Sequence, residues 1–352
     1  MFARDLLGFA VALAGAALAL WLDLPLPWML GPLILTAITR IGGLNSRCAR
    51  PLRNAGLWVI GTSLGLYFTP QVVGHIVAHG PAIMAGMLFA TALAAFGARF
   101  LQRFTGIDFR TAWFAASIGG ASEMSNLAER YGARTDRVAT VHSLRLLIVV
   151  LIVPFAYRAW GVTGLDPTIP GMGTVHLPGR ALLLVLTCAA AWLFHRLRVP
   201  NPWVLGPLAV ALALTSQEVE LSALPDVVLK GGQLLIGWSL GDRYRPDFLR
   251  AAPRFMAAVA VLTLLLLALS AGFAWLLSQL VAVPLPTLML GTTPGGISEM
   301  TITARVLQLG VPVVTAFHVT RMVFVVVTTG PLYRWLAPRY QRSEPGPDEM
   351  PS

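Results

Sequence analysis

Two glutamates stand in the same setting at two distant points of the chain, and they are the residues most able to do chemistry. Residues 119–124 read Gly-Gly-Ala-Ser-Glu-Met, and residues 295–300 read Gly-Gly-Ile-Ser-Glu-Met. Both glutamates, Glu123 and Glu299, fall inside apolar stretches, where a carboxylate is costly and marks a functional site by default. Such a group could bind a proton or a sodium ion. The structural alternative is an acidic residue in the first turn of a helix, where it faces free N–H groups.

The motif belongs to an internal duplication. An offset of 176 residues relates the two glutamates, and the same offset relates His142 to His318 and Arg145 to Arg321. The sequence Pro-Trp-x-Leu-Gly-Pro near the start of each half also recurs, at an offset of 175. Matches in this number and in one order indicate two fused half-proteins.

The composition excludes an ordinary soluble domain. Of the 352 residues, 56% are hydrophobic and 12% are charged, whereas a soluble domain is about a quarter charged. Apolar runs of helical length therefore predict an all-α polytopic membrane protein in contact with the lipid bilayer. The net charge of +10 fits basic loops on one side of a membrane. The two cysteines, Cys48 and Cys188, support neither a disulfide framework nor a thiolate metal site.

Six hydrophobic segments are expected in each half. In the first half they are approximately Leu6–Leu22, Trp28–Ile41, Leu52–Phe68, Pro81–Leu101, Thr111–Tyr131 and Val138–Tyr157. In the second half they are approximately Ala181–His195, Trp203–Thr215, Val227–Leu240, Phe255–Val281, Thr287–Leu309 and Val313–Leu336. The expected domains are a first membrane repeat at 1–160, a Gly/Pro-rich linker at 161–180, a second membrane repeat at 181–338 and a disordered cytoplasmic tail at 339–352.

Loop charges suggest that the two halves are inverted relative to each other. Arg53 is one of four arginines before the third segment of the first half, whereas the equivalent loop of the second half is acidic. Arg243 is one of four arginines after the third segment of the second half, whereas the equivalent loop of the first half has no Lys or Arg. This pattern predicts two inverted repeats with both termini cytoplasmic.

Inversion requires an odd number of crossings in each half, so one of the six segments should not cross. The fifth segment carries the Gly-Gly pair, and its two flanks have similar charge. We therefore expect about five transmembrane helices plus one re-entrant broken-helix hairpin in each repeat. A broken fifth helix that crosses fully is the alternative, and it would contradict the loop charges.

The two breaks predict a binding site. Non-helical backbone at membrane depth is tolerated only where it is buried in protein or lines a wet cavity. A half-helix should follow each Gly-Gly pair, with Ser122 or Ser298 as its N-cap, and its free N–H groups favour an anion. Close helix packing through small residues is the alternative. The expected substrate- or ion-binding residues are Gly119, Gly120, Ser122, Glu123, Asn126, His142, Arg145, Gly295, Gly296, Ser298, Glu299, Thr301, His318 and Arg321.

Each histidine and arginine of the repeated pairs lie three residues apart and so share a helix face. The arginines could pair with the glutamates as a structural bridge, or they could bind an anionic substrate through the guanidinium fork. The histidines could titrate near neutral pH or could simply be hydrogen-bonded in place. His75 and His79 are four residues apart but have no third ligand nearby, so no metal and no other cofactor is expected.

These residues resemble a known family. The repeated Gly-Gly-x-Ser-Glu-Met, the His-x-x-Arg that follows it and the Pro-Trp-x-Leu-Gly-Pro at 27–32 and 202–207 are similar to the AbrB-duplication family of bacterial inner-membrane proteins, from about Phe9 to Arg339. The resemblance implies a multi-pass protein of the bacterial inner membrane. Members are often labelled as transcriptional regulators, which implies regulation of gene expression, or as ammonia monooxygenases. The topology is also similar to that of sodium-coupled citrate and glutamate symporters.

The sequence leaves three functional hypotheses. The first is a secondary active transporter of a small anionic or zwitterionic solute, coupled to H+ or Na+. The second is a membrane-embedded sensor or regulator that affects gene expression without transport. The third, a monooxygenase, needs clustered metal ligands, which the sequence does not offer, so we expect no enzyme. No soluble nucleic-acid-binding module is evident, and a homodimer is an ordinary expectation for the assembly.

Overall fold

The computed structural model describes residues 2–164, 177–219, 222–244 and 253–341, and every regular element in these ranges is a helix. Much of the expected linker (165–176) and most of the expected tail (342–352) lie outside the described residues. The helices of the first half are α1 (Phe2–Trp21), α2 (Pro27–Ile41), α3 (Arg50–Gly65), α4 (Pro70–Ala78), α5 (Gly80–Thr105), α6 (Phe109–Ala116), α7 (Ala121–Arg130) and α8 (Thr135–Trp160). Those of the second half are α9 (Leu177–Arg196), α10 (Pro202–Thr215), α11 (Asp226–Gly241), α13 (Pro253–Ser278), α14 (Leu285–Thr292), α15 (Ile297–Val306) and α16 (Val311–Gln341).

The described helices follow the same order in both halves. The fifth expected segment is broken in each: α6 and α14 have eight residues, and α7 and α15 have ten. The expectation of helix, break and helix is therefore confirmed at both places. The short helix α4 was not expected, because its nine residues were assigned to a loop.

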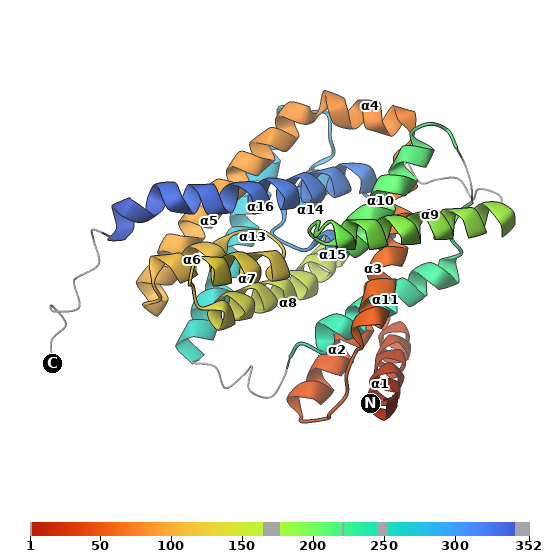
Figure 1. Cartoon of the computed structure of the whole chain (residues 1–352), viewed down its shortest axis with the longest axis horizontal. Helices are drawn as coiled ribbons and strands as arrows, with labels where there is room; N and C mark the ends of the chain where they lie inside the picture. Colours follow the sequence, from red (N-terminus) through yellow and green to blue (C-terminus); the bar gives the residue numbers. More distant parts are fainter. Residues whose placement is uncertain (1, 165–176, 220–221, 245–252, 342–352) are drawn as a thin grey trace.

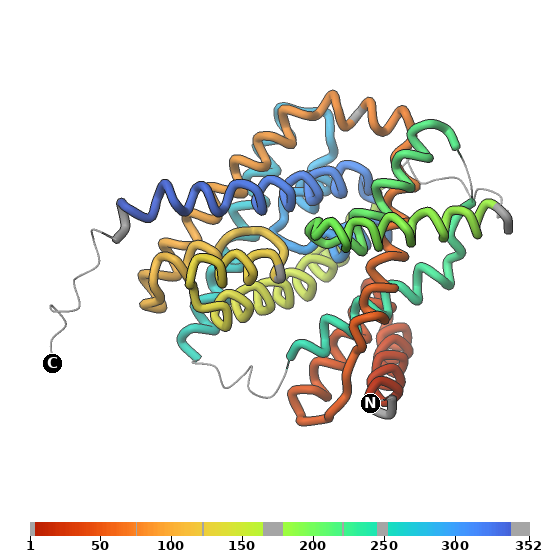
Figure 2. Tube along the Cα trace, in the orientation of Figure 1, coloured from red at the N-terminus to blue at the C-terminus, as the bar shows by residue number. Residues whose placement is uncertain are grey.

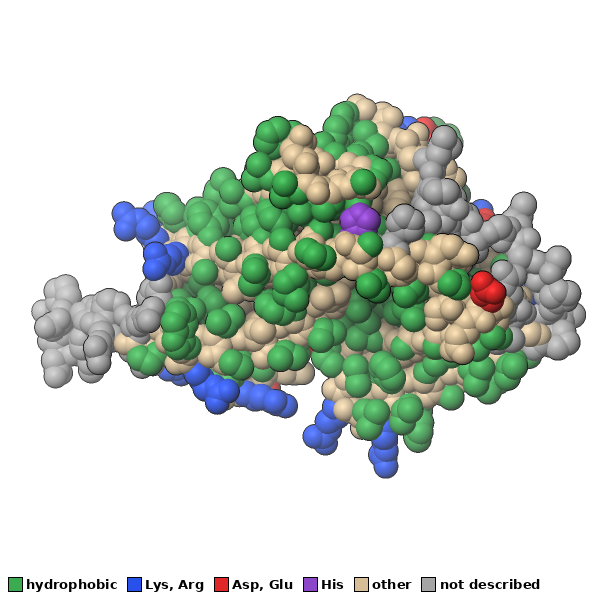
Figure 3. Space-filling view, turned by 90° about the horizontal axis from the view of Figure 1, so that it is seen from above, with side chains coloured by type: hydrophobic (Ala, Val, Ile, Leu, Met, Phe, Trp, Pro, Cys, Tyr) green, Lys and Arg blue, Asp and Glu red, His purple; other side chains and the backbone are tan. Residues whose placement is uncertain are grey.

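Five of the described helices are long and apolar enough to cross a membrane, namely α1, α5, α8, α13 and α16. The shorter α2 and α10 are also apolar, but their 15 and 14 residues fall short of the roughly 20 that a bilayer core needs. Figure 3 shows hydrophobic side chains over much of one face, with Lys and Arg side chains at its edges. These helices indicate a membrane protein, as the composition predicted.

The helices form two groups, which Figure 1 and Figure 2 show side by side. We call α1–α3 with α9–α11 the unbroken group, and α4–α8 with α13–α16 the broken-helix group. In the unbroken group, α2 packs on α11 and α3 packs on α10, so each half supplies a partner to the other. The main direct packing between the groups runs through α3, which touches α15 and α16.

Small residues allow the close approach inside the unbroken group. A Cβ at Gly61 of α3 would collide with the backbone of Val204, at the start of α10. A Cβ at Gly237 of α11 would collide with the backbone of Met29, at the start of α2. These are equivalent positions of the duplication, and helices that meet through backbone atoms gain dispersion and packing where lipid offers no hydrophobic driving force.

We predict that Gly237→Ala lowers the melting temperature of the detergent-solubilised protein. Overpacking of this kind costs about 1–3 kcal/mol, which exceeds the roughly 1 kcal/mol that Ala gains over Gly in a helix. Gly272→Ala in α13 is the matched control, because a Cβ there meets no atom within 4 Å. A Gly237→Ala protein as stable as the Gly272→Ala protein would contradict the packing of α2 on α11.

Candidate functional site

Each glutamate of the repeated motif folds back over the second glycine. Gly120 is the N-cap of α7, and a Cβ there would collide with the carboxylate of Glu123. Gly296 is the N-cap of α15, and a Cβ there would collide with the carboxylate of Glu299. The φ angles of these glycines are −68° and −82°, which any residue can adopt. Glycine is therefore favoured by space and not by backbone conformation, because a Cβ would force the carboxylate to move.

The methionine of each motif covers the first glycine in the same way. A Cβ at Gly119 would lie 2.8 Å from the Met124 side chain, and one at Gly295 would lie 2.8 Å from the Met300 side chain. The spacing Gly-Gly-x-Ser-Glu-Met thus follows from a tight turn into a helix, with two side chains folded over the turn. The expectation that the serines would be the N-caps is wrong, because each helix starts one residue after the second glycine.

A histidine and an arginine of α8 satisfy the carbonyl groups left at the end of α6. His142 Nε2 lies 3.0 Å from Phe114 O, and Arg145 Nη2 lies 3.0 Å from His142 Nδ1. Arg145 Nη1 also donates to Ala116 O at 3.4 Å and to Ser117 O at 3.3 Å. Because a guanidinium can only donate, Nδ1 of the imidazole accepts and Nε2 carries the hydrogen.

The second half repeats this arrangement between α16 and the end of α14. His318 Nε2 lies 2.9 Å from Leu290 O, and Arg321 Nη2 lies 2.9 Å from His318 Nδ1. Arg321 Nη1 and Nη2 donate to Thr293 O and Gly295 O, each at 2.6 Å. Both histidines are thus hydrogen-bonded in place, as one of the two alternatives proposed. No ion pair among the described residues joins either arginine to either glutamate.

One cavity of about 140 Å3 lies between the two groups of helices and brings the two breaks together. It is lined by most of the residues expected from the sequence, which are Gly119, Gly120, Glu123, His142, Arg145, Gly295, Gly296, Ser298, Glu299, His318 and Arg321. Asn126 is exposed on α7 and lies outside the lining. Thr301 is fully buried, and its hydroxyl donates to Ile297 O at 2.6 Å. The side chain of Ser122 lies outside the described part of the structure.

The opposite wall of the cavity comes from the unbroken group and was not expected. Arg53 of α3, Ser239 of α11 and Arg243 just after α11 line it, together with Asn201, the N-cap of α10. The backbone N–H of Asn201 donates to Glu123 Oε1 at 3.3 Å. The two arginines were noticed in the sequence only as basic loop residues.

An ion pair holds the end of α11 and thereby positions Arg243. Asp242 pairs with Arg40 at 3.1 Å and accepts the backbone N–H of Cys48 at 3.2 Å. Burial, and then the negative charge of Asp242, raises the pKa of the Cys48 thiol to about 12. The thiol is therefore neutral at neutral pH, and it adds no charge beside the cavity.

Positive charge exceeds negative charge around the cavity. Its lining holds four arginines and two glutamates, with both histidines neutral by their hydrogen bonds. The guanidinium of Arg53 is near enough to Arg243 to be repelled by it and near enough to Glu299 and Glu123 to be attracted by them. Two positive charges therefore remain without a compensating carboxylate in the lining, which favours an anionic ligand.

Comparison with known proteins places the chain in a family. A family model described as "Transition state regulatory protein AbrB" matches residues 28–337, which is most of the chain. The chain belongs to the AbrB family. The resemblance inferred from the repeated motifs is thus confirmed.

Two relatives of this AbrB-family chain are similar over nearly their whole length. "Putative regulator AbrB" of Escherichia coli (strain K12) is 26% identical over 312 residues, which cover 88% of this chain and 89% of the relative. "Uncharacterized protein YhjN" of Bacillus subtilis (strain 168) is 26% identical over 365 aligned positions, which cover 95% of this chain and 93% of the relative.

The two walls of the cavity in this AbrB-family chain differ despite the duplication. At the offset of 176, Arg53 corresponds to Leu229 and Arg243 corresponds to Tyr67. Leu229 and Tyr67 are buried, with 3% and 4% of their surface exposed. Within the unbroken group, charged residues therefore line the cavity at only one of each pair of equivalent places, and the other place belongs to the packed interior.

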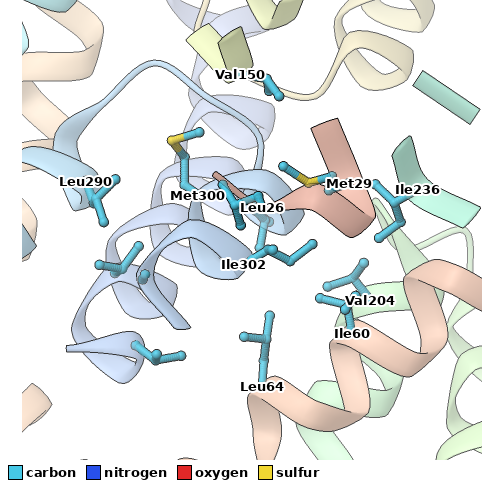
Figure 4. Close-up of a cluster of buried hydrophobic side chains, with 14 of the residues drawn as sticks. Leu26, Met29, Ile60, Leu64, Val150, Val204, Ile236, Leu290, Met300 and Ile302 are labelled. Atoms are coloured by element: carbon cyan, nitrogen blue, oxygen red, sulfur yellow. The ribbon is translucent and has the colours of Figure 1, made fainter. Parts of the chain in front are cut away.

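The two half-helices after the breaks are also buried to different degrees. Every residue from Ile297 to Ala304 of α15 is buried, whereas α7 has exposed residues along its length. Met300 and Ile302 of α15 lie in the hydrophobic cluster of Figure 4. That cluster also contains Ile60 and Leu64 of α3. One half-helix is thus buried against the unbroken group, while its counterpart keeps exposed residues.

We predict that the effect of Gly296→Ala depends on the carboxylate of Glu299. The added Cβ collides with that carboxylate, so Gly296→Ala should lower the melting temperature of the parent protein. In a Glu299→Ala background the same change should cost little, because the colliding group is gone. The difference between the two costs is a coupling energy of about 0.5–3 kcal/mol for residues in contact. Equal costs in both backgrounds would show that the glutamate does not fold over the glycine.

Proposed function

We propose that this AbrB-family protein is a secondary active transporter of a small anionic solute, coupled to H+ or Na+, and that the cavity between the two helix groups is its transport site. One observation carries the proposal: two broken helices meet at a single cavity whose lining has more arginines than glutamates. In secondary transporters, discontinuous helices form the substrate and ion sites at the interface of two repeats.

The size of the cavity limits the solute. Its volume is about 140 Å3, which is close to an engineered protein cavity of about 150 Å3 that holds benzene. A solute of a few non-hydrogen atoms fits this space without rearrangement. Small carboxylic acids and small zwitterions such as short amino acids have this size and carry an anionic group.

Two kinds of positive group would hold the anion. The N-terminal ends of α7 and α15 face the cavity through Gly120 and Gly296, and the positive end of a helix dipole favours negative charge nearby. Arg53 and Arg243 on the opposite wall add charge and a planar fork that suits a carboxylate. The anion would thus bridge the broken-helix group and the unbroken group.

We infer further that the two halves are inverted repeats in a bacterial inner membrane, with both termini in the cytoplasm. The matching helix order and the inverted loop charges support this arrangement. Arg53, in the first turn of α3, and Arg243, just after α11, belong to the basic stretches that we assign to the cytoplasmic side, so the cavity would be open to the cytoplasm in this state. Movement of the broken-helix group against the unbroken group would open the other side.

A membrane-embedded sensor is the second candidate, because the family description and the name of the Escherichia coli relative both refer to regulation. In that case the same cavity would bind the same kind of ligand, and the protein would signal to a partner without moving the ligand across the membrane. Binding experiments alone do not separate the two candidates, whereas flux does.

We predict that small anions raise the melting temperature of the purified protein, because a ligand that binds only the folded state stabilises it. Acetate, lactate, malonate, glycine and ethanolamine are suitable probes of charge and size. For the best anion, Arg53→Gln or Arg243→Gln should weaken binding by roughly tenfold to a hundredfold, the worth of a charged hydrogen bond. The matched control is Arg50→Gln, an exposed arginine one turn from Arg53. Stabilisation by ethanolamine and by no anion, or equal loss in the control, would contradict an anion site.

We predict that Glu123→Gln or Glu299→Gln abolishes accumulation of the best anion in proteoliposomes, while both proteins still insert and still bind the anion. A neutral amide keeps the shape of the side chain but cannot carry a proton or neutralise a cation. Full accumulation by the double variant would remove the glutamates from the mechanism. Binding without flux in the parent protein would favour the sensor.

A further inference from the structure

Two carbonyl groups at each helix break already accept hydrogen bonds from a buried arginine. In transporters with broken helices, the unwound carbonyls and the C-terminal ends of half-helices are the groups that coordinate a coupling Na+. In this chain the equivalent groups are at the ends of α6 and α14, and arginine side chains occupy them.

At the first break, the guanidinium of Arg145 donates to the carbonyls of Ala116 and Ser117, at 3.4 and 3.3 Å. Nε2–H of His142 donates to the carbonyl oxygen of Phe114 at 3.0 Å. Arg145 is 5% exposed. A charged donor therefore sits within the last turn of α6, where the helix carries partial negative charge.

The second break has the same occupant in the same place. Arg321 donates to Thr293 O and Gly295 O, each at 2.6 Å. Nε2–H of His318 donates to Leu290 O at 2.9 Å. The arrangement is thus built twice, from equivalent residues of the two halves. A Na+ ion at either break would have to displace a guanidinium or sit beside it, and like charges at this distance repel strongly in a buried site.

The described residues offer no cluster of His, Cys, Asp and Glu side chains for a cation. No three of these side chains are placed to hold a metal ion in the part of the chain that the structure describes. Thr301 and Thr303, next to the second break, are fully buried and lie outside the lining of the cavity. Both histidines in the lining are hydrogen-bonded to an arginine. The other protonatable groups that we consider there are the two glutamates.

We propose that the coupling ion is the proton and that transport is independent of Na+, with Arg145 and Arg321 as fixed cations at the two breaks and Glu123 and Glu299 as the proton carriers. This inference rests on the proposed transport function. When an anion enters the cavity, it lies near both carboxylates, and the mutual repulsion of like charges favours uptake of a proton by a glutamate. The proton and the anion then cross together and leave together.

Several charged and titratable groups face the two glutamates and bear on this titration. Glu299 is 7% exposed, and Glu123 is half-buried and accepts the N–H of Asn201. The facing groups are Arg53 of α3, Arg243 and Tyr244 after α11, His142 and Arg145 of α8, and His318 and Arg321 of α16. The four arginines among these groups attract an anion into the cavity, and the anion then lies beside both carboxylates.

The first test measures thermal stability in NaCl and in N-methylglucamine chloride, without and with the best anion of the panel, at two pH values. We expect no difference between the two cations. We also expect the apparent Kd of the anion to fall by up to about tenfold for each unit that the pH is lowered, as uptake of one proton requires. A rise in melting temperature specific to Na+ would overturn the inference, and so would anion binding that is the same at both pH values.

The second test removes one fixed cation. Arg321→Ala exposes the carbonyls of Thr293 and Gly295, so this protein, unlike the parent, should gain stability from Na+ or from guanidinium ion at millimolar concentration. Arg243→Ala is the matched control, because Arg243 lines the same cavity, whereas the described hydrogen bonds to the break carbonyls of Thr293 and Gly295 come from Arg321. If Arg321→Ala does not fold, Arg321→Lys keeps a cation at the break and should stay insensitive to Na+. Stabilisation of Arg321→Lys by Na+, or equal rescue of Arg243→Ala, would overturn the inference.

The two proposals fail in different ways. If no anion stabilises the parent protein, the transport proposal fails. The comparison of NaCl with N-methylglucamine chloride then still reports whether Na+ binds to the protein. If an anion binds and is accumulated but needs Na+, only the inference about the coupling ion fails.

Discussion

The structure depends on the compensation of two helix breaks inside an apolar protein. A break leaves carbonyl groups at the end of one half-helix and N–H groups at the start of the next, and each unpaired group buried away from water costs free energy. Here the carbonyl end receives Arg145 or Arg321 with its histidine, and the N–H end receives Glu123 or Glu299 folded over a glycine. Each break thus carries one positive and one negative side chain, and it is balanced before any ligand binds.

The duplication builds this balance twice, and the departures from symmetry create the site. Arg53, Arg243 and Asn201 line the cavity from the unbroken group, while the counterparts of the two arginines are buried in the packed interior. Helix α15 is packed against α3, whereas α7 is not enclosed to the same degree. The fixed charges of the breaks cancel, so the two additional arginines set the sign of the cavity and hence the class of ligand.

Much of this arrangement could be predicted from the sequence, because repeated residues report on local structure. The Gly-Gly pairs predicted both breaks, and the spacing of His142 and Arg145 predicted one shared face of a helix. The partners of the arginines could not be predicted, since a guanidinium can bind either a carboxylate or a backbone carbonyl and only the fold decides which lies nearby. Arg53 and Arg243 looked like ordinary basic loop residues for the same reason. Whether the halves are inverted in the membrane stays a prediction.

The most direct test of the account is proton movement driven by the anion in proteoliposomes. The protein is reconstituted without Na+, the membrane potential is clamped with K+ and valinomycin, and internal pH is followed with a trapped fluorescent dye while an inward gradient of the best-binding anion is applied. Proton-coupled transport predicts acidification of the interior that requires the anion and disappears in the Glu123→Gln and Glu299→Gln proteins. Anion entry with no change in internal pH, or acidification that begins only when Na+ is added, would contradict it.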